Sequence, residues 1–149
     1  MNDPLQILKM SKNILLVDWP NPGLPRVLLQ AGFAVYCFSP NKYTKAEIIP
    51  YAPVDINIKN IFPPDKEGDG YLVFRPLPEK PASIDIVYVY RPEEELPEII
   101  AEHVLPLGAK SLWLDPPGMS EAARRIIAES GLILIDNVFI SETTKNLAT

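Results

Sequence analysis

The sequence predicts an α/β fold in which helices cover both faces of a parallel sheet. Three observations indicate this. Residues 13–18 and 84–90 are short, nearly continuous apolar runs, as in strands that are buried on both faces. Residues 93–104 carry apolar side chains three or four positions apart, as in a helix with one buried face. Strand-like and helix-like segments also alternate along the chain, which is typical of a doubly wound sheet.

Length and composition fit one globular domain, which we expect to span residues 1–149. The net charge of −5 and the lack of a block of Lys or Arg disfavour a nucleic-acid surface. No apolar run reaches the roughly 20 residues that span a bilayer, so we expect no membrane partner. The first residues do not have the pattern of a signal peptide, and Cys37 reads as a small buried hydrophobe. We therefore expect a cytoplasmic protein.

The first quarter of the chain alternates helix and strand. Asp3 and Pro4 have the residue types of a helix N-cap and first helical position, so a short helix to about residue 10 is expected. A strand at 13–18 follows. The next helix is predicted over 25–31, with Gly32 as the residue that ends it, and a second strand over 33–39.

Residues 41–70 differ from the rest because apolar and polar residues alternate there with period two. Val54, Ile56 and Ile58 alternate with polar neighbours, which indicates a half-exposed strand. We expect an inserted antiparallel β-hairpin, 54–61 with 70–76, on one edge of the sheet. The hairpin can pack against its own domain or add its edge to a second copy, and because an edge strand with little charged protection invites pairing, a homodimer is the expected outcome.

The second half of the chain returns to strand and helix alternation. Ser120 has the residue type of an N-cap, and Gly131 that of a C-terminal stop, so they bound one helix. The tail from Asn137 shows no regular pattern, and a frayed end is expected. The predicted elements are a strand at 84–90, a helix at 93–104, a strand at 111–114, a helix at 120–130 and a strand at 132–136.

These elements define a Rossmann-like order of strands. Right-handed crossovers predict the order 71–75, 33–39, 13–18, 84–90, 111–114, 132–136. The order reverses between 13–18 and 84–90, and ligands in such sheets bind outside the C-terminal ends of the strands at that point. The loop after 13–18 leads into a helix N-terminus, which we expect to offer free backbone N–H groups to a phosphate.

Several stretches resemble a known family, in order and spacing rather than by one diagnostic motif. They are NILLVDWPNPGLPRV, AGFAVYCFSP, PASIDIVYVYRPEEELPEI, GAKSLWLDPPGMSEAARRIIAESGL and the IDN near the end. The chain resembles the small bacterial and archaeal CoA-binding proteins, which are related to the N-terminal domain of the succinyl-CoA synthetase α subunit. The resemblance implies a Rossmann-like fold that holds the nucleotide end of coenzyme A, with no established catalytic apparatus.

The sequence departs from this family at its ligand end. Asp18, Trp19 and Pro20 stand where the family usually has Gly-Ala-Ser or Gly-Leu-Ser, and the first loop is shorter. Ser39 replaces an Asn, Asp115 a Gln, and Val138 the usual cysteine of the tail. A carboxylate at Asp18 opposes a pyrophosphate, because like charges 4 Å apart repel by roughly 4 kcal/mol at an effective dielectric of about 20.

The candidate site residues follow the predicted crevice. Arg26 and Arg91 are candidates to face a phosphate, and for Arg26 a solvated surface position is the alternative. Trp19 is expected either to stack on an adenine or to pack within its loop. His103 reads as a satisfied, partly buried histidine of the helix face. The predicted cofactor-binding residues are Trp19, Pro20, Asn21, Gly23, Arg26, Ser39, Pro40, Arg91, Pro92 and Asp115, with no catalytic and no metal residue.

The sequence thus leads to three hypotheses about function. The first is a non-enzymatic module that binds CoA, an acyl-CoA or a related nucleotide. The second is a protein-interaction or scaffold domain on the same fold that has lost CoA binding, which the departures at Asp18 and Asp115 motivate. The third is an NAD-type enzyme, which lacks the Gly-x-Gly-x-x-Gly fingerprint and a convincing acid–base pair.

Overall fold

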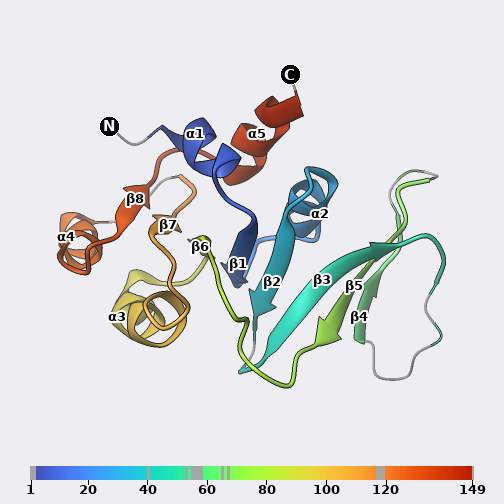
Figure 1. Ribbon diagram of the computed structural model, residues 1–149, viewed down its shortest axis with the longest axis horizontal. Helices are drawn as coiled ribbons and strands as arrows, with labels where there is room; N and C mark the ends of the chain where they lie inside the picture. Colours follow the sequence, from blue (N-terminus) through green and yellow to red (C-terminus); the bar gives the residue numbers. More distant parts are fainter. Residues whose placement is uncertain are drawn as a thin grey trace.

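The computed structural model describes residues 3–39, 41–52, 54, 59–64, 66, 68–116 and 120–148 (Figure 1). Within these residues the strands form one eight-stranded sheet of order β4-β5-β3-β2-β1-β6-β7-β8. The strands are β1 (Asn13–Val17), β2 (Ala34–Phe38), β3 (Tyr43–Ile49), β4 (Lys59–Phe62), β5 (Tyr71–Pro76), β6 (Ile86–Val89), β7 (Ser111–Trp113) and β8 (Ile133–Ile135).

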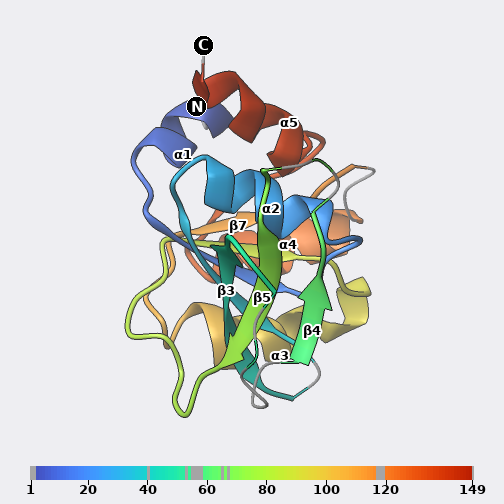
Figure 2. The same cartoon turned by 90° about the vertical axis from the view of Figure 1, so that its right-hand side faces the viewer.

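Helices cover both faces of this sheet, as the apolar strands require. Figure 2 shows α1, α2 and α5 on one side of it and α3 on the other. In the described part of the chain, no helix is both long and apolar enough to cross a membrane. The helices are α1 (Pro4–Lys9), α2 (Gly23–Gln30), α3 (Leu96–Ile99), α4 (Glu121–Glu129) and α5 (Ile140–Lys145), with 3₁₀ turns at Glu93–Glu95 and Asn146–Ala148 and a π turn at Ile100–Val104.

Two hydrophobic cores result, one on each face. Leu28 of α2 and Ile140 of α5 pack on one face with Leu16 of β1. Leu96 of α3 and Ile127 of α4 pack on the other face with β1 residues of the opposite orientation. Because alternate residues of a strand point to opposite faces, β1 supplies both cores and is buried almost throughout.

The parallel half of the sheet confirms the predicted fold class and the order of five strands. β1 pairs in parallel with β2 and with β6, and the sheet continues through β7 to β8. The order reverses between β1 and β6, at the position that the sequence predicts. The C-terminal ends of β1 and β6 therefore lie side by side, which is where this fold places ligands.

The antiparallel half differs from the prediction by one strand. β3 lies between β2 and β5 and is antiparallel to both, so the predicted contact between 33–39 and 71–75 is wrong. Its sequence alternates charged Lys45 and Glu47 with other residues and lacks the apolar run of a buried strand. The strand forms because both of its neighbours supply backbone partners, which local sequence does not encode.

The predicted hairpin is confirmed in the described residues. β4 and β5 are antiparallel, with Lys59 opposite Phe74 and Phe62 opposite Leu72, and β4 forms the edge of the sheet. Residues 55–58 lie outside the described residues. β5 is not peripheral, because Leu72 and Phe74 are buried in the core beneath α2.

Local signals place most helix ends correctly. The Asp3 side chain accepts hydrogen bonds at the start of α1, and Ser120 Oγ accepts one from Ala123 N at the start of α4. Gly32 and Gly131 follow α2 and α4 with φ of +99° and +77°, a left-handed conformation in which glycine carries no steric penalty. The helix predicted at 25–31 begins two residues earlier than expected, at Gly23.

The tail contradicts the expectation of an irregular end. α5 forms there and packs against α1 and α2 (Figure 1). Trp113 Nε1 donates to the Val138 carbonyl at 2.9 Å, and Asp115 accepts from the Ile140 N–H at 2.9 Å. These partners lie about two dozen residues earlier in the chain, so tertiary contacts rather than local pattern order the tail.

Candidate functional site

The loops after β1 and β6 meet at the predicted switch point. Val17 lies opposite Val89 in the last register position of the two parallel strands. Asp18 and Arg91 follow these strand ends, and Arg91 Nη1 donates to Asp18 Oδ2 at 3.1 Å. The fold therefore brings a predicted site residue, Arg91, against a carboxylate that is 73 positions away in sequence.

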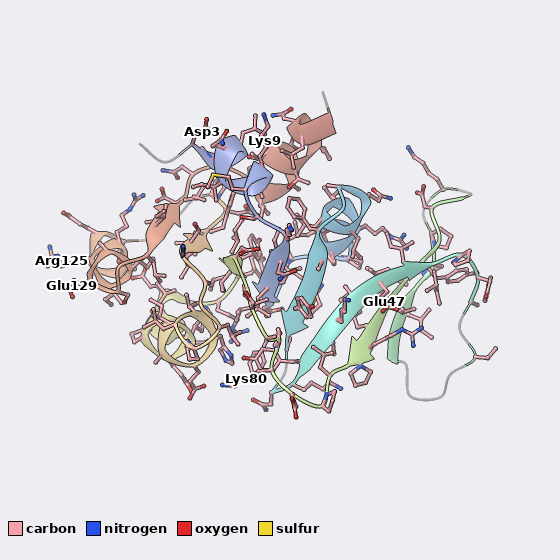
Figure 3. The ribbon with its side chains drawn as sticks, in the orientation of Figure 1. Asp3, Lys9, Glu47, Lys80, Arg125 and Glu129 are labelled. Carbon is pink, nitrogen blue, oxygen red and sulfur yellow. The ribbon has the colours of Figure 1, made fainter. Side chains whose placement is uncertain are left out.

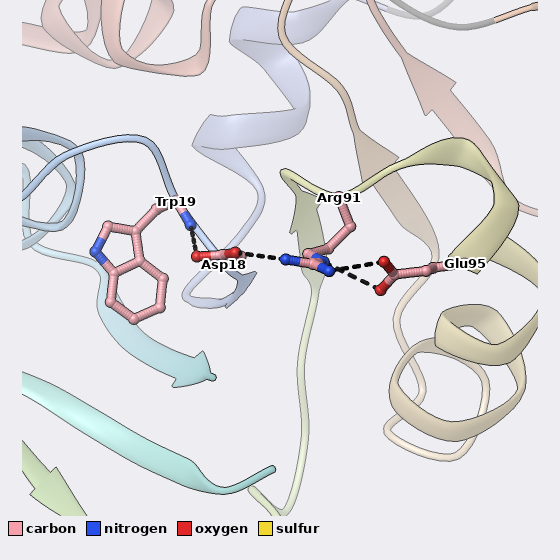
Figure 4. A network of polar contacts seen from close by, with 4 residues as sticks. All are labelled: Asp18, Trp19, Arg91 and Glu95. Atoms are coloured by element: carbon pink, nitrogen blue, oxygen red, sulfur yellow. Dashed lines mark hydrogen bonds and ion pairs between the residues drawn. The ribbon is translucent and has the colours of Figure 1, made fainter. Parts of the chain in front are cut away.

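Asp18 has an unusual backbone as well as an unusual side chain. Its φ is +62°, in the left-handed region that glycine adopts without cost and that Asp tolerates through local hydrogen bonding. Asp18 Oδ1 accepts the backbone N–H of Trp19 at 2.9 Å, as Figure 4 shows. Both carboxylate oxygens are therefore occupied by donors of the protein itself.

Arg91 is held from its other side by Glu95, one helical turn further on. Arg91 Nε donates to Glu95 Oε1 at 3.0 Å and Nη2 to Oε2 at 2.7 Å, a bidentate pair (Figure 4). Hydrogen bonds to Glu95, and then to Asp18, raise the pKa of Arg91. The same pair lowers the pKa of Glu95. Two carboxylates thus surround the one guanidinium at this position.

The start of α2 does not offer the free N–H groups that we predicted. Gly23 N donates to Asn21 Oδ1 at 2.9 Å, and Leu24 N lies 3.4 Å from Asn21 O. Pro25 has no N–H, and Arg26 N lies 3.4 Å from the Pro22 carbonyl. These donors of the first turn are satisfied or missing, so the predicted free N–H groups are not found there.

Arg26 does not reach the crevice either. Its side chain is buried, with 6% of the residue exposed. Nη1 donates to the Gly70 carbonyl at 3.0 Å, and Nη2 donates to the carbonyls of Phe62 and Pro63, both at 3.0 Å. The guanidinium therefore joins α2 to the β4–β5 connection, and neither the predicted phosphate contact nor the solvated alternative describes it.

Trp19 points away from the switch point towards the antiparallel half of the sheet. Its ring stacks on Phe74 of β5, with centroids 5.3 Å apart and an angle of 25° between the planes. This contact is the packing alternative of the sequence analysis. The ring packs on the core there and does not fill the crevice between β1 and β6.

One cleft opens on the α3 side of the switch point, and we call it the α3 cleft. It has a volume of about 290 Å³. Ser39 and Arg91 are the predicted site residues that line it. Its charges are mainly negative, because four carboxylates face one guanidinium. The lining residues are Val17, Asp18, Phe38, Ser39, Asn41, Arg91, Glu95, Glu98, Ile99, Glu102 and His103.

His103 lies in the wall of the α3 cleft, buried and bonded as expected. Its Nδ1 contacts the hydroxyl of Tyr43, and its ring packs against Phe38 at 4.1 Å between centroids. Burial lowers the pKa of His103, and burial followed by the charge of Glu102 raises the pKa of Tyr43 to about 12. The phenol therefore stays protonated and donates to a neutral imidazole. No sequence signal pointed to Tyr43 as this partner.

A second and larger cleft opens between α2 and α5, and we call it the α5 cleft. Its volume is about 610 Å³. The rings of Tyr90 and Phe139 are 52% and 48% exposed beside it. Sequence reasoning missed both rings, although Tyr90 directly follows a strand end. The lining residues are Pro20, Asn21, Gly23, Leu24, Val27, Tyr90, Asp115, Pro116, Phe139, Ser141, Glu142 and Lys145.

Asp115 lines the α5 cleft, but its carboxylate is committed to the protein. Oδ1 accepts the Ile140 N–H and Oδ2 accepts the Tyr88 hydroxyl, both at 2.9 Å. Burial raises the pKa of Asp115, and these two hydrogen bonds oppose the shift. Asp115 thus ties the start of α5 to β6, and both of its carboxylate oxygens already have donors.

Two predicted site residues, Pro92 and Pro40, remain to be placed. Pro92 is exposed and precedes the 3₁₀ turn that leads into α3. Pro40 lies outside the described residues. The structure therefore distributes the predicted set between two clefts: Ser39 and Arg91 line the α3 cleft, whereas Pro20, Asn21, Gly23 and Asp115 line the α5 cleft.

The sheet order and the two clefts at its switch point define a domain of the Rossmann-like α/β class. The sequence matches the family described as CoA binding domain over residues 31–142. The chain belongs to this family. The matched part begins after α2, so it does not include Asp18 and Trp19. Among curated proteins, none matches the sequence.

Solved structures support the fold. A protein from Thermus thermophilus is 20% identical with a TM-score of 0.57, covering 95% of this chain and 94% of that one. Prb, a protein redesigned for binding, is 19% identical with a TM-score of 0.63 over 97% of this chain and 89% of its own. A hypothetical protein from Pyrococcus horikoshii OT3 is 16% identical, with a TM-score of 0.57 and coverage of 99% and 94%. At these identities the likeness extends to the fold alone.

The β1–α2 loop and the α5 cleft differ in whether they fit a part of a CoA-type ligand. A pyrophosphate requires free N–H donors and an uncommitted cation. The Trp19 N–H of the β1–α2 loop and the neighbouring Arg91 guanidinium both donate hydrogen bonds to Asp18. This loop does not fit a pyrophosphate. The α5 cleft, with its exposed aromatic rings, does fit an uncharged, flat group.

Proposed function

We propose that the protein is a non-enzymatic binding module that holds a CoA-type ligand by an uncharged group in the α5 cleft. The observation that carries the proposal is the pair of half-exposed rings, Tyr90 and Phe139, beside a cleft of about 610 Å³ at the switch point. Ligand clefts are commonly 300–1,000 Å³ and lined by apolar and aromatic groups with few polar ones. Membership of the CoA-binding family supplies the ligand class.

Charge favours the adenine over the phosphates as the group that enters this cleft. Among the described residues that line this cleft, Lys145 is the one cation, whereas Asp115 and Glu142 both carry carboxyl groups. A ring that stacks on Tyr90 or Phe139 needs no charge, and aromatic pairs contribute about 0.5–1.5 kcal/mol beyond the area they bury. The phosphates of the ligand would then stay outside the loop after β1.

The absence of catalysis is part of the proposal, and the commitments of the reactive groups support it. Burial raises the pKa of Cys37, which keeps its thiol protonated and unreactive. His103 Nδ1 is engaged by Tyr43, and both oxygens of Asp115 accept hydrogen bonds. None of these three groups is poised to attack or deprotonate a ligand in either cleft.

Calorimetric titration tests the binding proposal. CoA, acetyl-CoA and adenosine are expected to give saturable heat with the unchanged protein, and Tyr90→Ala to weaken each of them about tenfold, which corresponds to 1.4 kcal/mol. Leu105→Ala is the matched control, because Leu105 is equally exposed but does not line the α5 cleft. No heat at millimolar CoA and adenosine would overturn the proposal. Parallel titrations with NAD and FAD test the enzyme hypothesis.

The second candidate function is a protein-interaction domain on this fold that has lost CoA binding. The specific observation in its favour is that donors of the β1–α2 loop are satisfied by Asp18 and Asn21. Such a loop is complete without a ligand. The same titration separates the two candidates, because the interaction domain predicts no heat with any of the nucleotides.

A homodimer and a cytoplasmic location belong to the proposal too. The position of β4 at the edge of the sheet supports pairing with a second copy. Ile61 of β4 is 40% exposed, so Ile61→Lys is expected to convert a dimer to a monomer in light scattering. An unchanged particle mass in Ile61→Lys would exclude this edge as the dimer contact.

The single cysteine, which is buried and reduced, supports a cytoplasmic location, and cell fractionation tests this location.

A further inference from the structure

The loop after β1 contains an anion of its own. We propose that the Asp18 carboxylate replaces a bound phosphate at the switch point, and so makes this loop selective against phosphate-bearing groups. The inference goes beyond the proposed function, which concerns a different cleft. It explains how a chain of the CoA-binding family keeps its loop ordered although the loop does not fit a pyrophosphate.

The donors around Asp18 are of the kinds that bind phosphates. Phosphates in α/β folds accept from backbone N–H groups of the first loop and from nearby cations. Asp18 Oδ1 accepts from one backbone N–H, that of Trp19, at 2.9 Å, and Oδ2 accepts from the Arg91 guanidinium at 3.1 Å. The carboxylate therefore takes the place of two oxygens of a phosphate.

The backbone conformation of Asp18 is one that glycine, which has no side chain, can also adopt. At φ of +62°, Asp18 has a conformation that glycine adopts more easily than any other residue. Removing the side chain therefore leaves the path of the loop compatible with its sequence and exposes the donors that the carboxylate covered. This property makes Asp18→Gly a test of the carboxylate rather than of the loop.

Glu95 strengthens the exclusion of phosphate. Its two oxygens bind Arg91 Nε and Nη2, so the guanidinium is already shared by two carboxylates. The group of Asp18, Arg91 and Glu95 carries a net negative charge when all three are ionised. This negative charge repels an incoming phosphate before the phosphate reaches a free donor, and the repulsion grows as the water between them is displaced.

The experiment uses inorganic pyrophosphate and ADP as probes of the 149-residue chain. Amide chemical shifts and calorimetry are recorded for the unchanged chain, Asp18→Gly, Asp18→Asn and Glu98→Gln. Glu98 is the matched control, because it lines the α3 cleft without a hydrogen bond to Arg91. Glu98→Gln therefore makes the cleft less negative and leaves the hydrogen bonds of Arg91 with Asp18 and Glu95 intact.

The expected result is that Asp18→Gly binds pyrophosphate at least about tenfold more tightly than the unchanged chain, with a shift of the Trp19 amide. Asp18→Asn is expected to bind more tightly than the unchanged chain and less tightly than Asp18→Gly, since its amide oxygen still accepts from Trp19. Glu98→Gln is expected to match the unchanged chain.

Two results would overturn the inference: equal affinities of Asp18→Gly and Glu98→Gln, or a Trp19 amide shift when the unchanged chain meets pyrophosphate. If Asp18→Gly does not fold, the test rests on Asp18→Asn. The inference is then overturned if Asp18→Asn binds pyrophosphate with the same affinity as the unchanged chain. Adenosine binding and its loss in Tyr90→Ala report on the α5 cleft alone, so the two proposals fail independently.

Discussion

Arg26 of α2 donates a hydrogen bond from Nη1 to the carbonyl oxygen of Gly70 across 3.0 Å, at the turn that precedes β5. Its Nη2 binds the Phe62 and Pro63 carbonyls at the end of β4. One buried guanidinium thus binds three carbonyls, at the end of β4 and in the connection from β4 to β5. The hairpin depends on its own domain through this contact, whether or not it also pairs with a second chain.

Arg26→Ala is expected to lower the free energy of unfolding by about 3 kcal/mol, because the buried Gly70 carbonyl and the part-buried hydrogen bonds to Phe62 and Pro63 lose their donor. Arg26→Lys is expected to recover only part of this, since a single ammonium does not reproduce the planar fan of donors. Urea unfolding measures both. Arg125 points outward from α4 (Figure 3), so Arg125→Ala is the control, with a change within about 0.5 kcal/mol. Equal effects of Arg26→Ala and Arg125→Ala would contradict the structural role.

Asp115→Ala is expected to loosen the tail helix, because it removes the acceptor of the Ile140 N–H and strands the Tyr88 hydroxyl. Each lost partner costs about 1–3 kcal/mol. Hydrogen exchange of the α5 amides is expected to accelerate well before global unfolding. Glu142→Ala, on the exposed side of the same helix, serves as control and is expected to leave the exchange unchanged. Protection of α5 that is the same in both variants would show that Asp115 does not anchor it.

His103 is expected to titrate below its ordinary pKa of 6.5, because burial penalises the imidazolium. Between that lowered pKa and 6.5 the unfolded chain binds a proton that the folded chain does not, so stability falls as the pH drops through this window. His103 is the only histidine in the sequence, so its ring signals in ¹⁵N NMR need no further assignment.

The same spectra report the tautomer. Because the Tyr43 hydroxyl donates to Nδ1, the proton of the neutral ring is expected on Nε2. Tyr43→Phe removes a hydrogen bond that favours the neutral ring, so the pKa of His103 is expected to rise towards 6.5. A proton on Nδ1, or a pKa that does not respond to Tyr43→Phe, would show that this pair does not form in solution.

Glu93 caps α4 from a distant part of the chain. Its carboxylate accepts from Ser120 N at 3.1 Å and Ser120 Oγ at 2.8 Å, and these bonds lower its pKa below 4.5. The contribution to stability is therefore full above pH 4.5 and is lost as the pH falls through the lowered pKa. Glu93→Gln is expected to reduce the urea midpoint at neutral pH and to match the unchanged chain in strong acid. Glu94→Gln, one residue on, is the control, and an equal loss in both would contradict the cap.

Local sequence patterns were sufficient for the parallel half of the fold. The apolar runs of β1 and β6 need cover on both faces, and Gly32 and Gly131 end helices for reasons that lie within a few residues. The switch point follows from the order of these elements, because crossover handedness leaves few alternatives. A crevice at the switch point was therefore predictable, although its division into two clefts was not, and Ser39 and Asp115 line different ones.

Tertiary structure alone decided which donors and charges remain free at those clefts. Arg26 in α2 and Arg91 in the loop after β6 have the same side chain, yet one binds three carbonyls and the other two carboxylates. β3 and α5 likewise form because distant residues supply their hydrogen-bond partners. The sequence by itself determined the family, the parallel half of the sheet and its switch point. The partners of each polar group depend on contacts between residues far apart in the chain, and these exist only once the domain has folded.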